Sequence, residues 1–127
     1  MLSQSNLQTI VLTSNLTQAE EFYGNVLGLS LKRHSDGTSI FDVNGSDLTL
    51  APVPDHTPSE HTVIGFSVPD VDEIVATLIK KEIELVRFKG FPHDASGVLR
   101  TPDGARVVWI RDPDRNLLSM VQFPKGA

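Results

Sequence analysis

The stretch that decides the fold is Asp112-Pro113-Asp114-Arg115-Asn116-Leu117-Leu118-Ser119-Met120. Pro113 has no N–H and pushes the residue before it out of the α region, so no helix runs through this point. Asp and Asn side chains readily close tight turns, and the residues from 117 to 123 are typical of a strand. The stretch therefore predicts a turn that leads into a buried strand. Taken alone it is an ordinary hairpin turn, and its further meaning depends on what the rest of the chain repeats.

The first copy of a repeated plan covers about residues 7–52. A strand at 7–13 is followed by a helix that Asn15 caps and Gly28 ends. Three more strands follow, separated by turn dipeptides and tripeptides rich in Asp, Asn and Gly, at residues 29–34, 38–43 and 47–51.

The second copy covers about residues 61–123 and follows a proline-containing linker at about 53–60. A strand at 61–68 precedes a helix that Asp70 caps and that runs to about Lys81. The sequence then predicts strands at 84–88, 105–111 and 117–123, with a longer loop at 91–100.

The two copies align with a fixed offset on either side of that loop. The helix caps Asn15 and Asp70 are 70 − 15 = 55 residues apart, and Thr49 matches Ser119 at 119 − 49 = 70 residues. A repeat of a whole supersecondary unit is a strong signal of fold, and neither unit can bury its sheet alone. The sequence therefore predicts one α+β domain over residues 1–127. In it, two βαβββ modules form paired sheets around a concave cavity, with the helices outside.

Side chains alternate across a strand, so each strand has a helix-facing set and a cavity-facing set. The predicted helix-facing residues are Thr9, Val11, Thr13, Ile64, Phe66, Val68, Val108, Ile110, Leu118 and Met120. The cavity-facing set is mostly apolar, with a few hydroxyls, one amide, one His and one Trp, which is typical of a small-molecule pocket. Its members are Gln8, Ile10, Leu12, Thr49, Ala51, His61, Val63, Gly65, Ser67, Val107, Trp109, Leu117, Ser119 and Val121.

Composition excludes several classes of function. The net charge of −5 argues against nonspecific binding of nucleic acid or anionic membranes, which requires a basic surface. The absence of cysteine excludes disulfides, thiolate metal sites and cysteine nucleophiles, and it suits the cytoplasm. No signal peptide is evident, and no apolar run approaches the ~18 residues that span a bilayer.

Three stretches carry a resemblance to a known family: residues 22–29 (FYGNVLGL), 68–72 (VPDVD) and 112–116 (DPDRN). With them, the chain resembles the vicinal oxygen chelate superfamily, which includes glyoxalase I, extradiol dioxygenases and bleomycin-resistance proteins. The resemblance covers nearly the whole chain. It implies paired βαβββ modules and commonly a homodimer, whereas it says little about function because one fold hosts many chemistries.

The resemblance also implies where a metal would be held. Family enzymes usually ligate a divalent ion from the first and fourth strands of each module, which corresponds to Gln8, Thr49, Val63 and Ser119. Gln8 is tolerable, but neutral hydroxyls are poor ligands for a hard cation and valine cannot ligate. Ser119 stands where the family pattern has Glu, and Arg115 stands where it has Gly. We therefore expect no divalent-metal cofactor.

Two histidines remain open as candidates. His61 is either a displaced metal ligand or a polar group at the pocket or strand end. His93, with Asp94, is either an acid–base pair or part of a surface loop, and adjacent residues rarely converge. No catalytic residue can be named from the sequence.

Trp109 is the most informative cavity-facing residue. It either packs in the core or offers a flat surface on which a planar ligand stacks. Phe91 and Phe88 either close over such a ligand or pack beneath the long loop.

The sequence thus favours a metal-independent protein of the bleomycin-resistance type that binds a planar or aromatic small molecule by sequestration. The alternative is a divalent-metal-dependent lyase, isomerase or dioxygenase whose ligands have moved to Gln8, His61 or His93. A metal-free enzyme with ordinary acid–base groups ranks lowest. The sequence leaves open whether the modules pair within one chain or swap between two.

Overall fold

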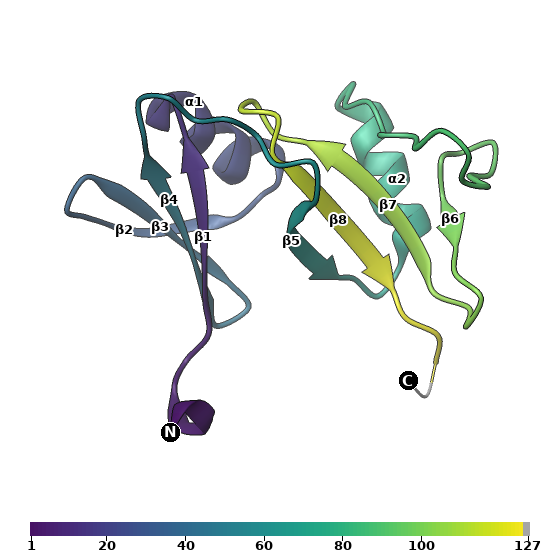
Figure 1. Ribbon diagram of the computed structural model, residues 1–127, viewed down its shortest axis with the longest axis horizontal. Coiled ribbons are helices and arrows are strands. Elements are labelled where there is room, and N and C mark those ends of the chain that lie inside the picture. The colour runs from purple at the N-terminus through teal and green to yellow at the C-terminus, as the bar shows by residue number, and fades with distance from the viewer. Residues whose placement is uncertain (126–127) are drawn as a thin grey trace. The chain divides into compact units, whose positions relative to one another are not determined.

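The computed structural model describes residues 1–125 and has the predicted α+β class. The chain divides after Pro58 into two compact units, each built on one four-stranded sheet (Figure 1). The predicted order of a strand, a helix and three strands occurs in both units. None of the helices in residues 1–125 combines the length and the apolarity that a bilayer-spanning segment needs.

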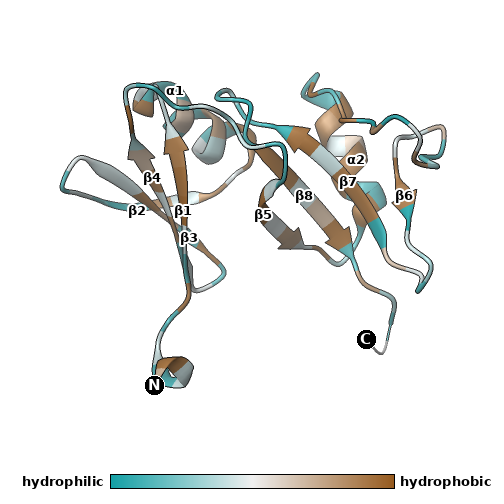
Figure 2. Cartoon of the chain, in the orientation of Figure 1, coloured by the Kyte–Doolittle hydropathy of each residue, from teal (hydrophilic) through white to brown (hydrophobic). Residues whose placement is uncertain are grey.

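In the first unit, a short 3₁₀ turn (Leu2–Gln4) precedes the sheet, whose strand order is β1-β4-β3-β2. β1 and β4 run parallel, and the other pairs are antiparallel. Figure 2 shows that the edge strand β2 is largely hydrophilic, and charged side chains on an edge oppose pairing with other chains. The strands are β1 (Gln8–Thr13), β2 (Ser30–Ser35), β3 (Thr38–Val43) and β4 (Ser46–Pro52).

The first helix begins as predicted but changes its winding. The Asn15 side chain accepts a hydrogen bond from Gln18 N at 3.1 Å and caps α1 (Leu16–Glu21). The chain then continues as a π-helical turn (Phe22–Val26), in which Leu27 N donates to Phe22 O at 2.9 Å, five residues back. A π turn is wider than an α turn, so a prediction of one regular helix misses it.

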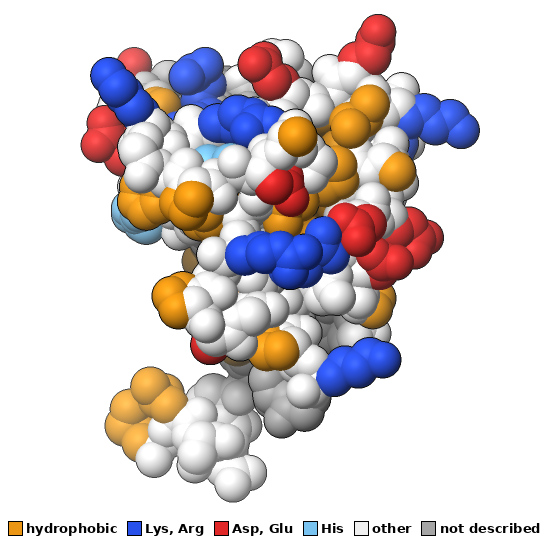
Figure 3. Space-filling model, turned by 90° about the vertical axis from the view of Figure 1, so that its right-hand side faces the viewer, with side chains coloured by type: hydrophobic (Ala, Val, Ile, Leu, Met, Phe, Trp, Pro, Cys, Tyr) orange, Lys and Arg blue, Asp and Glu red, His pale blue; other side chains and the backbone are white. Residues whose placement is uncertain are grey.

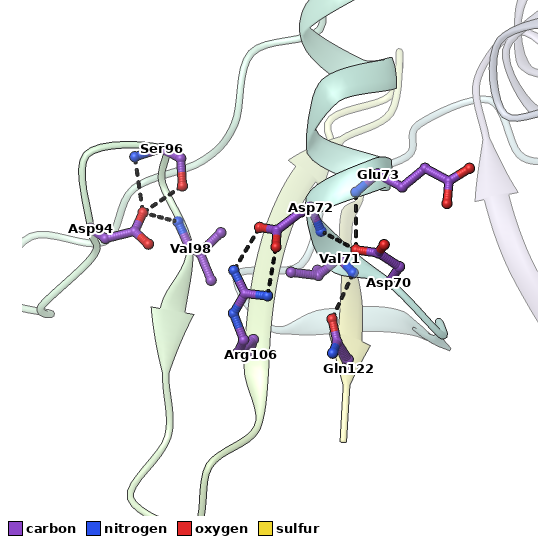
Figure 4. Close-up of polar contacts among 9 residues, drawn as sticks. All are labelled: Asp70, Val71, Asp72, Glu73, Asp94, Ser96, Val98, Arg106 and Gln122. Carbon is purple, nitrogen blue, oxygen red and sulfur yellow. Dashed lines mark hydrogen bonds and ion pairs between the residues drawn. The ribbon is translucent and has the colours of Figure 1, made fainter. Parts of the chain in front are cut away.

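The second unit contains β5 (Thr62–Ser67), α2 (Val71–Lys80), β6 (Leu99–Arg100), β7 (Arg106–Arg111) and β8 (Leu117–Gln122). Its strand order, β5-β8-β7-β6, repeats that of the first unit, again with the first and last strands parallel. The Asp70 carboxylate caps α2 by accepting from Asp72 N and Glu73 N, and the Gln122 side chain of β8 accepts from Val71 N (Figure 4).

The strand predicted at 84–88 is wrong. The place beside β7 belongs to β6, which lies in the predicted loop and pairs Leu99 with Val107. Residues 84–88 make a single backbone bond to β7, from Val86 N to Trp109 O at 2.8 Å, and then bend into a loop that is closed by its own hydrogen bonds. The apolar side chains at 83, 85, 86 and 88 are therefore half-buried without forming a ladder.

Strand register confirms the internal repeat. Ile10 pairs with Thr49 in the first sheet, and Gly65 pairs with Ser119 in the second, which reproduces the offsets of 65 − 10 = 55 and 119 − 49 = 70 residues. One irregularity breaks the match. Thr62 pairs with Leu117 and Ile64 with Leu118, so Val63 is the extra residue of a β-bulge. The bulge corrects the prediction for this strand, because Thr62 takes the place expected of Val63 on the open face.

The buried face of each sheet is largely the predicted one. Thr9, Phe66 and Val68 are half-buried, and the other predicted helix-facing residues are buried. Two members of the predicted cavity-facing set, Val107 and Leu117, keep the predicted side of their strands but are also buried, at 9% and 2% exposed. Val107 lies between Leu99 and Val121, and Leu117 lies in a row with Thr62 and Arg111, so cross-strand neighbours flank both.

The Asp112–Asn116 turn has the predicted form and is closed by one carboxylate. Asp112 Oδ1 accepts from Asp114 N at 2.9 Å and from Asn116 N at 2.8 Å, while Asp112 Oδ2 accepts from Asn116 Nδ2 at 2.9 Å. Arg115 has a φ of +68°, in the left-handed region that favours glycine. Arg115, which stands where the family pattern has Gly, thus has a backbone conformation that glycine adopts more easily.

Replacing Arg115 by glycine is expected to raise the free energy of unfolding by about 0.5–1 kcal/mol, because it removes the steric cost of positive φ. The Arg111 guanidinium donates to the backbone carbonyl of residue 115, which glycine also has, so this hydrogen bond is retained. Urea unfolding followed by circular dichroism measures the change. The matched control is Lys81→Gly, an exposed position with φ of −88°, where glycine should destabilise. A loss of stability in Arg115→Gly would contradict the argument.

Candidate functional site

The open face of the second sheet carries a row of three cross-strand neighbours: Gly65 on β5, Ser119 on β8 and Trp109 on β7. Trp109 is half-buried, and its Nε1 donates a long hydrogen bond of 3.3 Å to Thr62 Oγ1. A Cβ added to Gly65 would meet only Ser119 Oγ within 4 Å, at 3.2 Å. The row therefore places an indole next to two hydroxyls, those of Ser119 and Thr62, with a position that lacks a side chain on the other side of Ser119.

An aromatic cluster forms around the indole of this row. The Phe88 ring meets Trp109 edge to face, with centroids 5.0 Å apart and planes at 87°, and the His93 ring lies 5.9 Å from Trp109 at 71°. Phe91 contacts Phe88 at 6.2 Å and is itself 60% exposed. Phe88 thus packs under the loop against Trp109, while Phe91 lies at the outer end of the cluster.

His93 and Asp94 do not form an acid–base pair. Both ring nitrogens of His93 are bonded to loop backbone, at Phe88 N and Gly97 O. The Asp94 carboxylate accepts from Ser96 and Val98 instead, and the Ser96 hydroxyl bond, with these backbone bonds, holds the pKa of Asp94 below its ordinary value. This arrangement favours the surface-loop interpretation and leaves His93 no free nitrogen for a metal.

The first sheet separates two residues that the resemblance groups. Gln8 pairs with Asp47, whereas Thr49 lies between Ile10 and Ile40. Gln8 lines a polar hollow of about 440 Å³ together with Asn6, Leu7, Lys32, Gly45, Ser46 and Asp47. Lys32 Nζ donates to Asp47 Oδ1 at 2.7 Å, and this bond holds the pKa of Asp47 below its ordinary value.

His61 lies at the exposed start of the second module, before β5. Its Nδ1 is 2.9 Å from Ser59 Oγ. The neighbouring Val63 is the bulged residue. Among residues 1–125, neither position belongs to a group of three His, Cys, Asp or Glu side chains.

The positions that the resemblance assigns to a metal do not fit one. Within residues 1–125, no three His, Cys, Asp or Glu side chains cluster closely enough to hold an ion. Thr49 has isoleucines on both sides, Ser119 lies between Gly65 and Trp109, and Val63 has no donor atom. Hydroxyls in such surroundings are weak ligands for hard cations.

A polar cluster, in which Ser39 is buried, Glu20 half-buried and His34 exposed, joins α1 to the first sheet. Glu20 Oε1 accepts from Ser39 Oγ at 2.5 Å and lies 2.6 Å from His34 Nε2. Ser39 is 0% exposed, so its hydroxyl is out of reach of a substrate. The Ser39 hydrogen bond, followed by the one with His34, lowers the pKa of Glu20, and the cluster is structural.

Glu20→Gln should make the protein less sensitive to acid. Because the folded-state pKa of Glu20 lies below its ordinary value of 4.5, its ionised form stabilises the fold above that value. This stability is lost as the pH falls through the folded-state pKa. Melting temperatures at pH 7 and pH 3 should therefore differ more in the wild type than in Glu20→Gln. Equal acid sensitivity in the two proteins would count against the cluster.

Sequence reasoning missed Thr62, Asp47 and Lys32. The bulge hides Thr62, because period-two alternation counted back from Ser67 through Gly65 arrives at Val63 and not at Thr62. Asp47 lies two residues before Thr49 on β4, so strand alternation already predicts that the two side chains share a face. Lys32 reaches Asp47 from β2, a strand not paired with β4, and no local pattern predicts this contact.

Other proteins share this fold. A lactoylglutathione lyase from Agrobacterium tumefaciens is 24% identical, with a TM-score of 0.71 over 94% of this chain and 93% of that chain. A fosfomycin resistance protein from Listeria monocytogenes is 14% identical, with a TM-score of 0.73 over 96% of this chain and 95% of that one. No curated relative matches the sequence significantly.

The sequence itself matches a family model. The model for the Glyoxalase/Bleomycin resistance protein/Dioxygenase superfamily covers residues 7–120, from just before β1 into β8. This match spans both modules, and the structural likeness agrees with it. The chain therefore belongs to the Glyoxalase/Bleomycin resistance protein/Dioxygenase superfamily.

Proposed function

We propose that the protein binds a planar aromatic small molecule on the open face of its second sheet, against Trp109 and without a metal. The single observation that carries this proposal is the Gly65–Ser119–Trp109 row. A flat ligand that stacks on indole gains dispersion and buries apolar area. Gly65 leaves room for it, and the hydroxyls of Ser119 and Thr62 are available to orient its polar edge.

Rigidity behind the indole supports the same proposal. Phe88 meets Trp109 edge to face, and the loop that carries Phe88 is closed by hydrogen bonds of His93, Asp94 and Arg87. A preorganised aromatic surface loses little conformational entropy when a ligand binds. The protein would then act by sequestering its ligand.

Intrinsic fluorescence tests this proposal directly, because Trp109 is the only tryptophan in the chain. We expect saturable quenching of Trp109 by planar aromatic probes, with ethidium as the cation and 8-anilinonaphthalene-1-sulfonate as the anion. Saturation with metal-free, chelator-treated protein would support metal-independent binding. Linear, non-saturable quenching by every probe would overturn the proposal.

A metal-dependent lyase, isomerase or dioxygenase is the alternative. The observation that favours it is the pairing of Gln8 with Asp47, two oxygen donors on the open face of the first sheet. Elemental mass spectrometry after incubation with zinc, nickel, manganese and iron(II) separates the two functions. About one retained ion per chain, with turnover that His61→Ala or Gln8→Ala abolishes, would replace the binding proposal by this one.

We also propose that the protein is a cytoplasmic homodimer. β1 is an edge strand without charged side chains, and its Ile10 and Leu12 are 56% and 41% exposed, in keeping with cover by another chain. Sedimentation equilibrium measures the oligomeric state.

On the face shown in Figure 3, Lys and Arg side chains lie among Asp and Glu, so that face offers no uniformly basic surface to nucleic acid.

A further inference from the structure

The imidazole of His93 bridges two parts of the loop between α2 and β6. Nε2 accepts a hydrogen bond from Phe88 N at 3.0 Å, and Nδ1 lies 2.9 Å from Gly97 O. A carbonyl oxygen can only accept, so Nδ1 carries the proton and donates it. A backbone N–H can only donate, so Nε2 must be unprotonated. The two bonds together require the neutral ring in one tautomer.

The same ring lies against the proposed binding surface. Its centroid is 6.1 Å from that of Phe88 and 5.9 Å from that of Trp109. The bond from Phe88 N to His93 thus fixes the backbone of the residue whose ring meets Trp109 edge to face. The charge state of His93 is therefore linked to the geometry of the indole surface.

The charged groups around His93 are committed elsewhere or exposed. Arg87 donates to the carbonyls of Asp94 and Ala95 at 2.9 and 2.8 Å, and the Asp94 carboxylate caps the turn at Ser96 and Val98. Lys89 on the loop and Arg100 on β6 are exposed. β7 presents the uncharged Trp109 to the ring. The Asp94 turn therefore closes one half of the loop independently of His93.

We propose that His93 is a positioning residue that holds Phe88 against Trp109 only while it is neutral, so that acid releases Phe88 and the binding surface loses its ordered geometry. Protonation would put a hydrogen on Nε2 that points at Phe88 N–H, so that two donors face each other. Water can accept from both groups once they separate, so the protonated protein favours the open loop. The effect on ligand affinity rests on the proposed function, whereas the release of Phe88 is a property of the protein alone.

One interaction opposes this release. An imidazolium that stayed beside Trp109 would gain a cation–π attraction to the indole. The two outcomes have different signatures. A ring that stays quenches Trp109 without moving its emission maximum, whereas release of Phe88 exposes the indole to water and shifts the emission to the red.

The first test therefore follows the Trp109 emission maximum between pH 8 and pH 5 without any ligand. We expect a red shift of about 5–10 nm in the wild type and in the control His61→Asn, which removes an exposed histidine of the same module. The His93→Asn side chain can still donate to Gly97 O but lacks the Nε2 acceptor, and we expect its emission to be shifted at pH 8 and insensitive to pH. A wild type that is only quenched, or a red shift that persists in His93→Asn, would overturn the proposal.

Hydrogen exchange of the wild type keeps the test independent of any variant. After correction for intrinsic exchange rates, the protection factor of the Phe88 amide should be at least tenfold lower at pH 5 than at pH 8. The Val98 amide, which Asp94 holds, should keep its protection. Equal changes in protection at both amides would mean general loosening and would refute a role specific to His93.

Ligand affinity is then measured with ethidium, whose charge does not change in this range. We expect affinity at least fivefold weaker at pH 5 than at pH 8 in the wild type, and pH-independent affinity in His93→Asn. If ethidium does not bind at either pH while the emission shift is present, the proposed function fails and the positioning role stands. If ethidium binds equally at both pH values, the coupling to binding is wrong.

Discussion

Replacing Asp112 by alanine is expected to lower the free energy of unfolding by about 3–5 kcal/mol. Asp112 is 5% exposed, and its carboxylate accepts three hydrogen bonds, from Asp114 N, Asn116 N and Asn116 Nδ2. Asn116 is 2% exposed, so its two donors would be left buried and without this acceptor. Unpaired buried donors cost the full desolvation penalty, so a single substitution in this turn has a large effect on the free energy of unfolding.

Urea unfolding at pH 7 measures this change, with Asp112→Asn as the matched variant. Asparagine keeps Oδ1 for the backbone donors but turns an NH₂ toward Asn116 Nδ2. The loss should therefore be smaller than for alanine, but still measurable. A loss below about 1 kcal/mol in Asp112→Ala, within the range of ordinary surface substitutions, would show that the carboxylate is not what holds the turn.

Replacing Gly65 by leucine is expected to weaken ethidium binding at least ~100-fold, which corresponds to about 2.7 kcal/mol. Gly65 lies in one row with Ser119 and Trp109, so a leucine side chain would fill the space in which a flat ligand meets the indole. Gly65 has no positive φ, and its Cβ would press only on the Ser119 hydroxyl. We therefore expect the melting temperature to change little.

The control for this substitution is Ser67→Leu, on the same strand and the same face. Ser67 pairs with Val121, one side-chain step farther along the sheet from Trp109. Ser67→Leu places the same leucine side chain on this face outside the row, and we expect less than a tenfold loss of affinity. If the Gly65→Leu variant binds ethidium as tightly as the wild type, the open face of the second sheet is not the binding site.

Local chemistry explains why the turns and the helix starts were predictable. Asp-Pro-Asp cannot continue a helix, and Asn15 and Asp70 accept the free N–H groups of the turns that follow them. These residues act on neighbours within five positions. The repeat of the whole plan then restricted the topology, and the registers of Thr49 and Ser119 agree with it.

The misplaced elements depend on competition between distant segments. Residues 84–88 are apolar enough for a strand, but β6 occupies the edge of β7. Which of two segments pairs with an edge is decided by the whole loop, including the contacts of His93 and Asp94. Likewise, nothing in the sequence of β5 marks Val63 as the bulged residue.

The candidate site was predictable in part. Trp109, Gly65 and Ser119 follow from alternation, since all three face the same way in regular strands. The role of His93 does not follow from the sequence. A histidine beside an aspartate suggests chemistry, whereas the structure turns the two side chains to different partners.

The parallel pairing of the first and last strands in each unit has a consequence for synthesis. β8 lies between β5 and β7, so the last strand of this sheet to be synthesised completes its middle and not its edge. Until Gln122 has emerged, β5 has no partner in its own sheet. A nascent chain that stalls before this point, or a product that a premature stop codon ends there, would expose β5 without a strand partner and β7 with one open edge. Chaperones would therefore encounter a gap in the middle of the sheet and not a missing edge strand.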